Sequence, residues 1–205
     1  MKKLIYTIGY TGFAVNEFIE LLKQKNINVV IDVRSTPYSE RYAEYNKESL
    51  EKVLKENRIY YRNYVSEFGA RQDSPEFYSS EGYLDFELFS KSQQFSNGVN
   101  KICNSIEQGY GIVILCAEKK PIQCHRTILV ARAFSQLGYD VIHLMPNAQT
   151  MSQKQVESEL LNKYFPSRGQ ISLFSECNMT DEECLREAYR MQNKKIGYRM
   201  DGEDE

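Results

Sequence analysis

The stretch GIVILCAEKKPIQCHRTILVARAFSQLG, residues 111–138, predicts a strand, a turn and a helix in direct succession. Its first part, GIVILCA, is a nearly continuous apolar run, as in strands buried on both faces of a parallel sheet. Its last part, IQCHRTILVARAFSQLG, has the apolar spacing of a helix. Two cysteines, a glutamate, a histidine and an arginine surround the turn. The stretch therefore predicts a βα unit whose turn carries reactive side chains.

The rest of the chain repeats this alternation of strands and helices. Such an order favours right-handed crossovers and an α/β fold: a mostly parallel central sheet of about five strands with helices on both faces. We expect residues 1–165 to form this single domain, with a long functional loop and a short helix between residues 65 and 95. The other expected strands are 4–10, 27–33, 59–64 and 139–145, and the other expected helices are 15–26, 47–58, 99–109 and 152–165.

Residues 166–205 have the composition of a C-terminal extension. Thr180 and Glu183 have the spacing of a capping box, which predicts the start of a short helix. The chain ends in DGEDE, which we expect to be an acidic tail.

The composition is that of a globular protein, with 41% hydrophobic and 26% charged residues among 205. No apolar run is long enough to span a membrane, and the N-terminus lacks the apolar core of a signal peptide. Five cysteines are an odd number without framework spacing, which favours reduced thiols and a cytoplasmic protein. The net charge of −2 argues against capture of nucleic acid by overall charge. A local basic surface is still expected, because tyrosines between 38 and 83 are mixed with arginines at 34, 41, 58, 62 and 71.

The Cys124-His125-Arg126 corner is the first candidate for chemistry. At a helix start, free N–H groups and the positive end of the dipole favour anions and stabilise a thiolate. Arg126 can then bind an anion, and His125 can act as acid or base. The alternative is that Cys116 and Cys124 are small buried packing residues. We expect no metal and no other cofactor, since adjacent residues are awkward ligands for one ion.

The ends of the parallel strands supply the other candidates, because ligands bind beyond the carboxyl ends of such strands. Asp32 and Arg34 follow the second strand and point the same way, either as an ion pair or as a base and an anion-binding group. Glu118 follows the fourth strand and is a candidate acid or base. The further candidates for substrate binding are Tyr10 and Thr11 after the first strand, Cys116, and Arg71.

Five stretches, TIGY, IDVRSTPYS, YVSEFGAR, LCAEKKPIQCHR and VIHLM, resemble the domain of unknown function 488 family. They follow in order over roughly residues 3 to 145, and the CAE…CHR motif is the most specific of them. The resemblance implies an α/β domain but no established reaction. The family commonly has a histidine where this chain has Tyr10, which shifts the weight of any catalytic histidine to His125. His143, inside the fifth strand, is expected to be a satisfied core or rim residue.

The segment GQISLF, residues 169–174, resembles the peptide by which bacterial DNA enzymes bind the replication sliding clamp. In that resemblance Gln170 forms hydrogen bonds while Leu173 and Phe174 enter apolar pockets, as an extended peptide. The alternative is that these apolar residues fold back onto the domain.

Together these features favour an enzyme that acts on nucleic acid or nucleotides, with DNA repair as one setting. If a thiol attacks, Cys124 is the nucleophile and His125 or Glu118 activates it. If water attacks, Glu118 or Asp32 is the base. The alternatives are a small-molecule thiol enzyme for sulfur or phosphoryl transfer without a DNA role, and a non-catalytic ligand-binding module.

Overall fold

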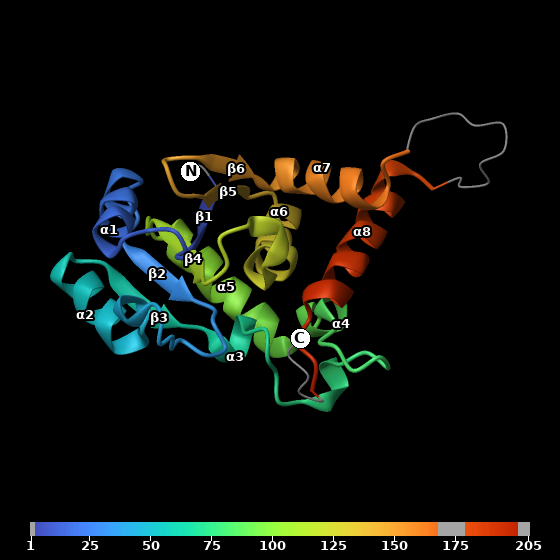
Figure 1. The fold of residues 1–205 in the computed structure, drawn as a ribbon, viewed down its shortest axis with the longest axis horizontal. Coiled ribbons are helices and arrows are strands. Elements are labelled where there is room, and N and C mark those ends of the chain that lie inside the picture. Colours follow the sequence, from blue (N-terminus) through green and yellow to red (C-terminus); the bar gives the residue numbers. More distant parts are fainter. Residues whose placement is uncertain (1–2, 168–178, 201–205) are drawn as a thin grey trace.

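A six-stranded, mostly parallel sheet forms the centre of the chain in this computed structural model, which describes residues 3–167 and 179–200 (Figure 1). The strand order is β3-β2-β4-β1-β5-β6, and only β6 is antiparallel to its neighbour. The predicted α/β fold and the five predicted strands are therefore confirmed. The sixth was missed because three residues are too few to show alternation. The strands are β1 (Leu4–Gly9), β2 (Val29–Asp32), β3 (Tyr60–Asn63), β4 (Ile112–Cys116), β5 (Asp140–Leu144) and β6 (Thr150–Ser152).

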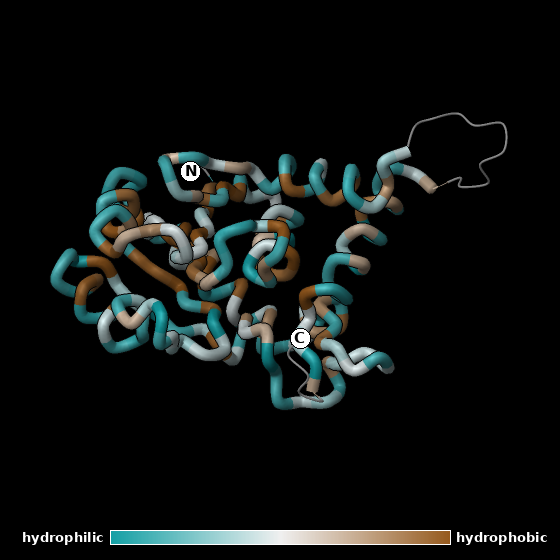
Figure 2. The backbone as a smooth tube through the Cα atoms, in the orientation of Figure 1, coloured by the Kyte–Doolittle hydropathy of each residue, from teal (hydrophilic) through white to brown (hydrophobic). Residues whose placement is uncertain are grey.

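Helices cover both faces of the sheet, as predicted. Each face has its own hydrophobic cluster: α1 and α2 contribute to one, and α5, α6, α7 and α8 to the other. In Figure 2 the central strands are largely hydrophobic, whereas α1 and α2 alternate between hydrophobic and hydrophilic residues. The helices are α1 (Val15–Gln24), α2 (Lys47–Glu56), α3 (Val65–Phe68), α4 (Phe86–Ser90), α5 (Gln93–Glu107), α6 (Arg132–Gln136), α7 (Gln153–Tyr164) and α8 (Asp181–Ile196).

Successive residues of each strand point to opposite faces, which decides what each strand end can reach. On β4, Val113 and Leu115 pack on the α1–α2 side, whereas Ile112, Ile114 and Cys116 pack on the other side. The even-numbered residues at the end of β4 therefore point toward α5 and the chain that follows β4.

Residues 65–95 contain more structure than the predicted loop with one short helix. They hold α3 and α4, and α5 already begins at Gln93, where the Ser92 hydroxyl accepts a hydrogen bond from the Phe95 N–H at 3.2 Å. The Phe95 ring packs edge-on against Phe68 and Phe89, at centroid distances of 5.1 and 5.7 Å. The contact between Phe68 and Phe95 joins residues 27 positions apart, so local periodicity did not reveal it.

The chain after Cys124 does not form the uninterrupted α-helix that its spacing predicts. Pro121–Gln123 is a 3₁₀ turn and Arg126–Ala131 is a π-helical segment that continues into α6. Cys124 is extended, with φ −128° and ψ 136°, whereas His125 is helical, with φ −59° and ψ −30°. This change of backbone conformation turns two consecutive side chains toward one place, and it carries Arg126 into the interior.

The C-terminal helix α8 shares the hydrophobic core of the sheet domain through Ala188 and Tyr189. Its predicted capping box is present, since the Thr180 hydroxyl accepts from the Glu183 N–H at 3.2 Å. After α8 the chain pairs with residues 82–84; the Leu84 N–H donates to the Tyr198 carbonyl at 2.8 Å. The GQISLF segment and the DGEDE tail lie outside the described residues. Among the described helices, none has the length and apolar character needed to cross a membrane.

Candidate active site

A cavity of about 780 Å³ opens at the carboxyl ends of β2 and β4, where the sequence places the candidate residues. Four parts of the chain line it: the segment after β2, the segment after α3, the βα turn after β4, and the end of α8. The lining residues are Arg34, Ser35, Thr36, Ala70, Arg71, Cys116, Ala117, Glu118, His125, Lys195, Ile196, Gly197, Tyr198 and Arg199.

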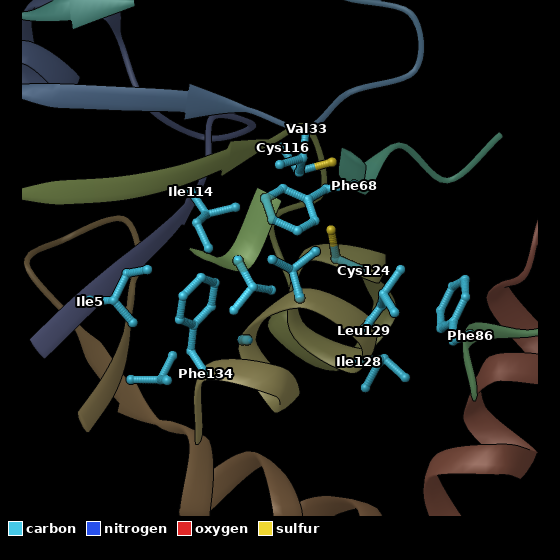
Figure 3. Packing of buried hydrophobic residues seen from close by; sticks show 14 of the residues in the cluster. Ile5, Val33, Phe68, Phe86, Ile114, Cys116, Cys124, Ile128, Leu129 and Phe134 are labelled. Atoms are coloured by element: carbon cyan, nitrogen blue, oxygen red, sulfur yellow. The ribbon is translucent and has the colours of Figure 1, made fainter. Parts of the chain in front are cut away.

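Cys116, Glu118, Cys124 and His125 form a cluster at the inner end of this cavity. Cys124 Sγ lies 2.8 Å from Glu118 Oε2, and Cys116 Sγ lies 3.8 Å from His125 Nδ1. One potential ligand atom from each of Cys116, Cys124 and His125 lies within 4.8 Å of the other two. Cys124 and His125 thus point to the same place although they are adjacent in sequence. Figure 3 shows both cysteine side chains beside Val33 and Phe68. Neither cysteine is in a disulfide.

The members of this cluster differ in their access to the cavity. The Glu118 side chain is 44% exposed, and Cys116 and His125 line the cavity although they are nearly buried. Cys124 is 1% exposed and is not a lining residue. Glu118 is therefore the member that a molecule in the cavity reaches most directly.

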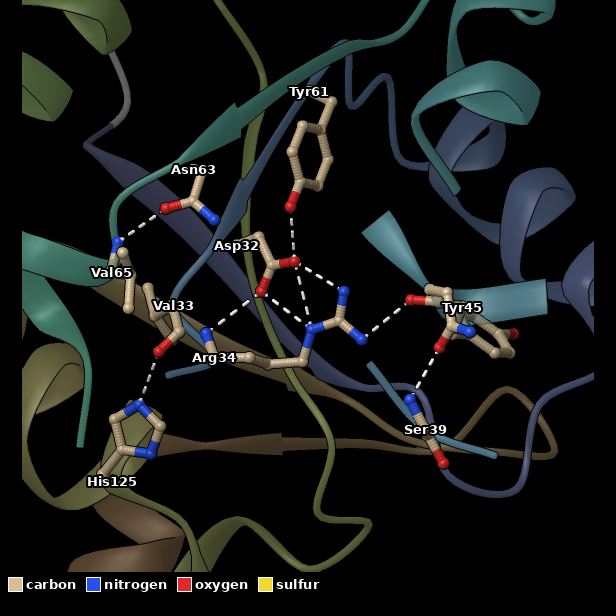
Figure 4. Close-up of polar contacts among 10 residues, drawn as sticks. Asp32, Val33, Arg34, Ser39, Tyr45, Tyr61, Asn63, Val65 and His125 are labelled. Carbon is tan, nitrogen blue, oxygen red and sulfur yellow. Dashed lines mark hydrogen bonds and ion pairs between the residues drawn. The ribbon is translucent and has the colours of Figure 1, made fainter. Parts of the chain in front are cut away.

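A hydrogen bond to the backbone of Val33, the residue after β2, holds the His125 ring in one orientation. His125 Nε2 lies 3.0 Å from the Val33 carbonyl oxygen (Figure 4). A carbonyl can only accept, so Nε2 carries the hydrogen and, in the neutral ring, Nδ1 presents its lone pair to Cys116.

The charges in the cluster favour a thiolate on Cys124. Burial alone raises the pKa of the Cys124 thiol, but the Cys116 hydrogen bond and the charges of Arg126 and His125 bring it well below its ordinary value. The pKa of Cys116 is raised, first by burial and then by Cys124. The pKa of Glu118 is raised, first by partial desolvation of its carboxylate, which remains 44% exposed, and then by the charge of Cys124. Burial lowers the pKa of His125, yet its interaction with Cys124 raises it overall.

Arg126 is a fully buried cation next to this cluster. Its Nη1 donates to the Glu118 carbonyl oxygen at 2.7 Å, and its Nε donates to the Thr7 hydroxyl at 3.4 Å. The nearest carboxylate, that of Glu118, is 3.9 Å away, and Nη2 has no hydrogen-bond partner among the described residues. On the far side of Thr7, both ring nitrogens of His143 form hydrogen bonds: Nδ1 with the Thr7 hydroxyl at 2.7 Å, and Nε2 with Gln153 Oε1 at 2.9 Å. His143 is thus the satisfied core residue that the sequence predicts.

Asp32 and Arg34 form an ion pair: Asp32 points to the α1–α2 face of the sheet beside Tyr61, whereas Arg34 also lines the cavity. Arg34 Nη2 donates to Asp32 Oδ2 at 2.6 Å, and its Nε donates to the same carboxylate (Figure 4). The Tyr61 hydroxyl also donates to Asp32, at 2.7 Å, while Arg34 Nη1 donates to the Tyr45 carbonyl at 2.8 Å. The two side chains point the same way, as predicted. Their polar groups satisfy each other in an ion pair, and the roles of Asp32 as a base and of Arg34 as an anion-binding group stay predictions.

The residues after β1 and the residue Arg71 differ in their relation to the cavity. Tyr10 stacks on Tyr45 at a centroid distance of 4.5 Å and lies outside the lining, as does Thr11. Arg71 lines the cavity, and its guanidinium lies 4.4 Å from the ring centroid of Tyr198.

Sequence reasoning missed the contribution of the chain after α8 to this cavity. Lys195, Tyr198 and Arg199 come from a segment that we expected in a separate extension. No local signal marks them: Lys195 is placed by the packing of α8, and Tyr198 and Arg199 by the pairing of residues 198–200 with residues 82–84. Thr7 was also missed, although its place on β1 directs it to the same face as Cys116.

The tyrosines between 38 and 83 are mostly structural. Tyr45, Tyr61 and Tyr83 are buried in the core, whereas Tyr38 and Tyr60 are exposed. The Arg41 guanidinium lies against the Tyr42 ring, and the Arg62 guanidinium lies against the Tyr60 ring. The stacking surface expected from these tyrosines is therefore limited to the exposed rings.

The fold and the site define an α/β protein with a thiol–imidazole–carboxylate cluster beyond the ends of its parallel strands. The chain belongs to the family described as Domain of unknown function DUF488, whose model matches residues 14–133. That range includes the whole CAE…CHR motif and the Asp32–Arg34 pair. Neither a curated protein nor a solved structure matches the chain.

Proposed function

We propose that this protein is an enzyme that acts on nucleotides or nucleic acid and that water is the attacking group. The observation that carries this proposal is the cavity itself. Positively charged side chains lie at its rim, and Glu118, His125 and Cys116 lie at its inner end. Such a combination of an anion-binding rim and acid–base groups in one cleft is typical of an active site.

The rim suits a phosphate-bearing substrate. Arg71, Lys195 and Arg199 line the cavity, and none of them forms an ion pair with a carboxylate of residues 3–167 or 179–200. A volume of about 780 Å³ is in the range of small-molecule sites and accommodates a mononucleotide or one extruded base. The Tyr198 ring adds an aromatic surface for a base.

Glu118 is the proposed general base. A water molecule held beside its carboxylate gives up a proton to it as the water oxygen bonds to the reacting atom of the substrate. The bond to the leaving group then breaks, and Glu118 returns the proton to that group. We assign this role to Glu118 because its side chain is 44% exposed, so that water and substrate in the cavity can reach its carboxylate.

A thiol route is the second candidate, and the electrostatics of Cys124 favour it. The charges of Arg126 and His125 stabilise its thiolate, the form that attacks. In that route the Cys124 sulfur bonds to the substrate as the bond to the leaving group breaks, His125 or Glu118 protonates that group, and water later cleaves the adduct. Intact-mass spectrometry of a quenched reaction therefore detects an adduct. Direct attack by water leaves no adduct, and this difference separates the two routes.

We further propose that Gln170, Leu173 and Phe174 bind the sliding clamp of a cytoplasmic DNA-repair machinery. The support is the order of residues in GQISLF alone. Clamp capture by the native chain and by the Gln170→Ala, Phe174→Ala double variant tests it. Equal capture by both chains contradicts the clamp proposal and leaves the enzyme proposal in place.

Substrate binding is tested by calorimetric titration with a panel of mononucleotides and short single strands. We expect one class to bind, and the Arg71→Ala, Arg199→Ala double variant to bind it at least 10-fold more weakly. A matched control is Arg190→Ala, because Arg190 lies on α8 outside the cavity lining. No binding by the native protein, or equal binding by the double variant, contradicts the proposal.

A further inference from the structure

We propose that Cys116, Cys124 and His125 hold one Zn²⁺ ion. The inference deepens the proposed function, on which it rests for its catalytic meaning, because a metal at this place would activate the attacking water. The binding of the ion itself follows from the geometry of the three side chains.

The donor set and its spacing fit zinc. Two thiolates and one imidazole are ligands that Zn²⁺ prefers, and three protein ligands with an open fourth position are typical of catalytic zinc. The three donor atoms lie within 4.8 Å of one another, and the 3.8 Å between Cys116 Sγ and His125 Nδ1 is close to the edge of a tetrahedral site. Small side-chain adjustments therefore suffice to close all three on one ion.

The orientation of His125 is an independent observation that points to a metal. Its Nε2–H donates to the Val33 carbonyl at 3.0 Å, so Nδ1 is the free donor atom and it faces the thiols. Metal-bound histidines are held in this way, with the second ring nitrogen bonded to a carbonyl or carboxylate.

The surrounding charges accommodate the ion. With zinc bound, both cysteines are thiolates and His125 is neutral, and the protons that these groups still carry pass to solvent, so the ion and its ligands carry no net charge. The positive charge of Arg126 and the negative charge of Glu118 then balance each other. The Arg126 Nη2 has no hydrogen-bond partner among the described residues, so thiolates in this cluster would help to balance its buried charge.

The open position lies toward the cavity. Cys116 and His125 are lining residues, whereas Cys124 closes the cluster from the buried side. Glu118 follows the ligand Cys116 by two residues and its carboxylate is within 2.8 Å of Cys124 Sγ. In zinc hydrolases of nucleobases, a non-ligand glutamate two residues after a ligand moves protons beside zinc that is held by histidine and cysteines.

Metal titration of the full chain tests the proposal without any nucleotide. After removal of metal with a chelator, we expect one equivalent of Zn²⁺ to bind, and Co²⁺ in its place to give thiolate charge-transfer and tetrahedral d–d bands. Cys116→Ser, Cys124→Ser and His125→Gln should each weaken Zn²⁺ binding at least 100-fold. Cys103→Ser is the matched control, since this cysteine of α5 lies outside the cluster, and it should bind like the native chain.

Two results overturn the zinc site. One is a folded native chain that binds less than a tenth of an equivalent at micromolar Zn²⁺. The other is Zn²⁺ binding by the Cys116→Ser and Cys124→Ser variants that is as tight as binding by the native chain. Failure of the proposed function is a separate result: zinc binds with the expected variant pattern, but no nucleotide binds or is consumed. Turnover that is equal in zinc-free and zinc-loaded protein removes the catalytic meaning of the ion.

Discussion

At the scale of single residues, buried charge and its partners set the design of this protein. Asp32 and Arg126 are both fully buried. Among the described residues, Asp32 accepts from four donor groups, three of Arg34 and the Tyr61 hydroxyl, whereas Arg126 has one carboxylate at 3.9 Å. A buried charge is tolerated when it is paired and hydrogen-bonded. Asp32 therefore belongs to a fully hydrogen-bonded ion pair. The buried charge of Arg126, in contrast, would be stabilised by another anionic group beside it.

Removal of the Asp32 charge tests the structural assignment of the pair. Asp32→Asn leaves the Arg34 guanidinium buried without a carboxylate, so we expect the free energy of unfolding to fall by about 3–5 kcal/mol in urea titrations. The matched control is Glu67→Gln, which breaks a pair in which the Lys101 side chain is 59% exposed, and should cost less than about 1 kcal/mol. Equal losses for the two variants contradict the assignment.

His143 gives the stability of the protein a defined pH dependence. Burial, and next the charge of Arg126, lowers its pKa from 6.5 to about 3. Between these values the unfolded chain binds a proton that the folded chain does not, so stability is lost as the pH falls through this window. We expect urea titrations of the native chain to lose up to about 1.4 kcal/mol per pH unit more than His143→Gln does between pH 6 and 4. If stability falls with pH equally steeply in the native chain and in His143→Gln, this role of His143 is contradicted.

At the scale of elements, close approach of β1 to the turn after β4 holds the site together. Gly9 pairs with Cys116, and a Cβ on Gly9 would lie 1.8 Å from the Glu118 carbonyl oxygen. That same oxygen accepts the hydrogen bond from Arg126. The glycine of the TIGY stretch is thus required by the packing of β1, and it keeps Arg126 beside the thiols.

Gly9→Ala is expected to disturb the site as well as the fold. The added methyl must push the Glu118 carbonyl away, which should cost about 1–3 kcal/mol of stability and weaken both zinc and nucleotide binding. Gly138→Ala is the matched control, because its φ of +80° carries a backbone cost of about 1 kcal/mol while no atom lies within 4 Å of the new methyl. Unchanged ligand binding by Gly9→Ala contradicts this role of Gly9.

At the scale of the whole molecule, segments far apart in the sequence, from residues 34–36 to residues 195–199, meet at one cavity. The strand alternation and the apolar runs were sufficient to predict the sheet, its two covered faces and the edge at which Cys116, Glu118 and His125 gather. The π-helical turn at Arg126 and the return of Lys195, Tyr198 and Arg199 were not predictable. They depend on contacts between distant segments, to which local spacing gives no signal.

The rim charges predict a modest salt dependence for a protein of net charge −2. With three cations neutralising phosphates, log K for a short single strand should fall with log salt at a slope of about −2. Arg71→Ala should reduce the slope by about 0.7, whereas Arg190→Ala should leave it unchanged. A slope near zero in fluorescence titrations contradicts binding by this rim.

The turnover of a nucleotide panel by the native chain and by Glu118→Gln, followed by mass spectrometry, tests the central claim most directly. We expect the native chain to consume one class of nucleotide, and Glu118→Gln to do so about 10²–10⁴-fold more slowly while it still binds zinc. Glu48→Gln, an exposed change on α2, is the control and should match the native rate. Equal rates for the native chain and Glu118→Gln, or no nucleotide consumed by either, contradict the account.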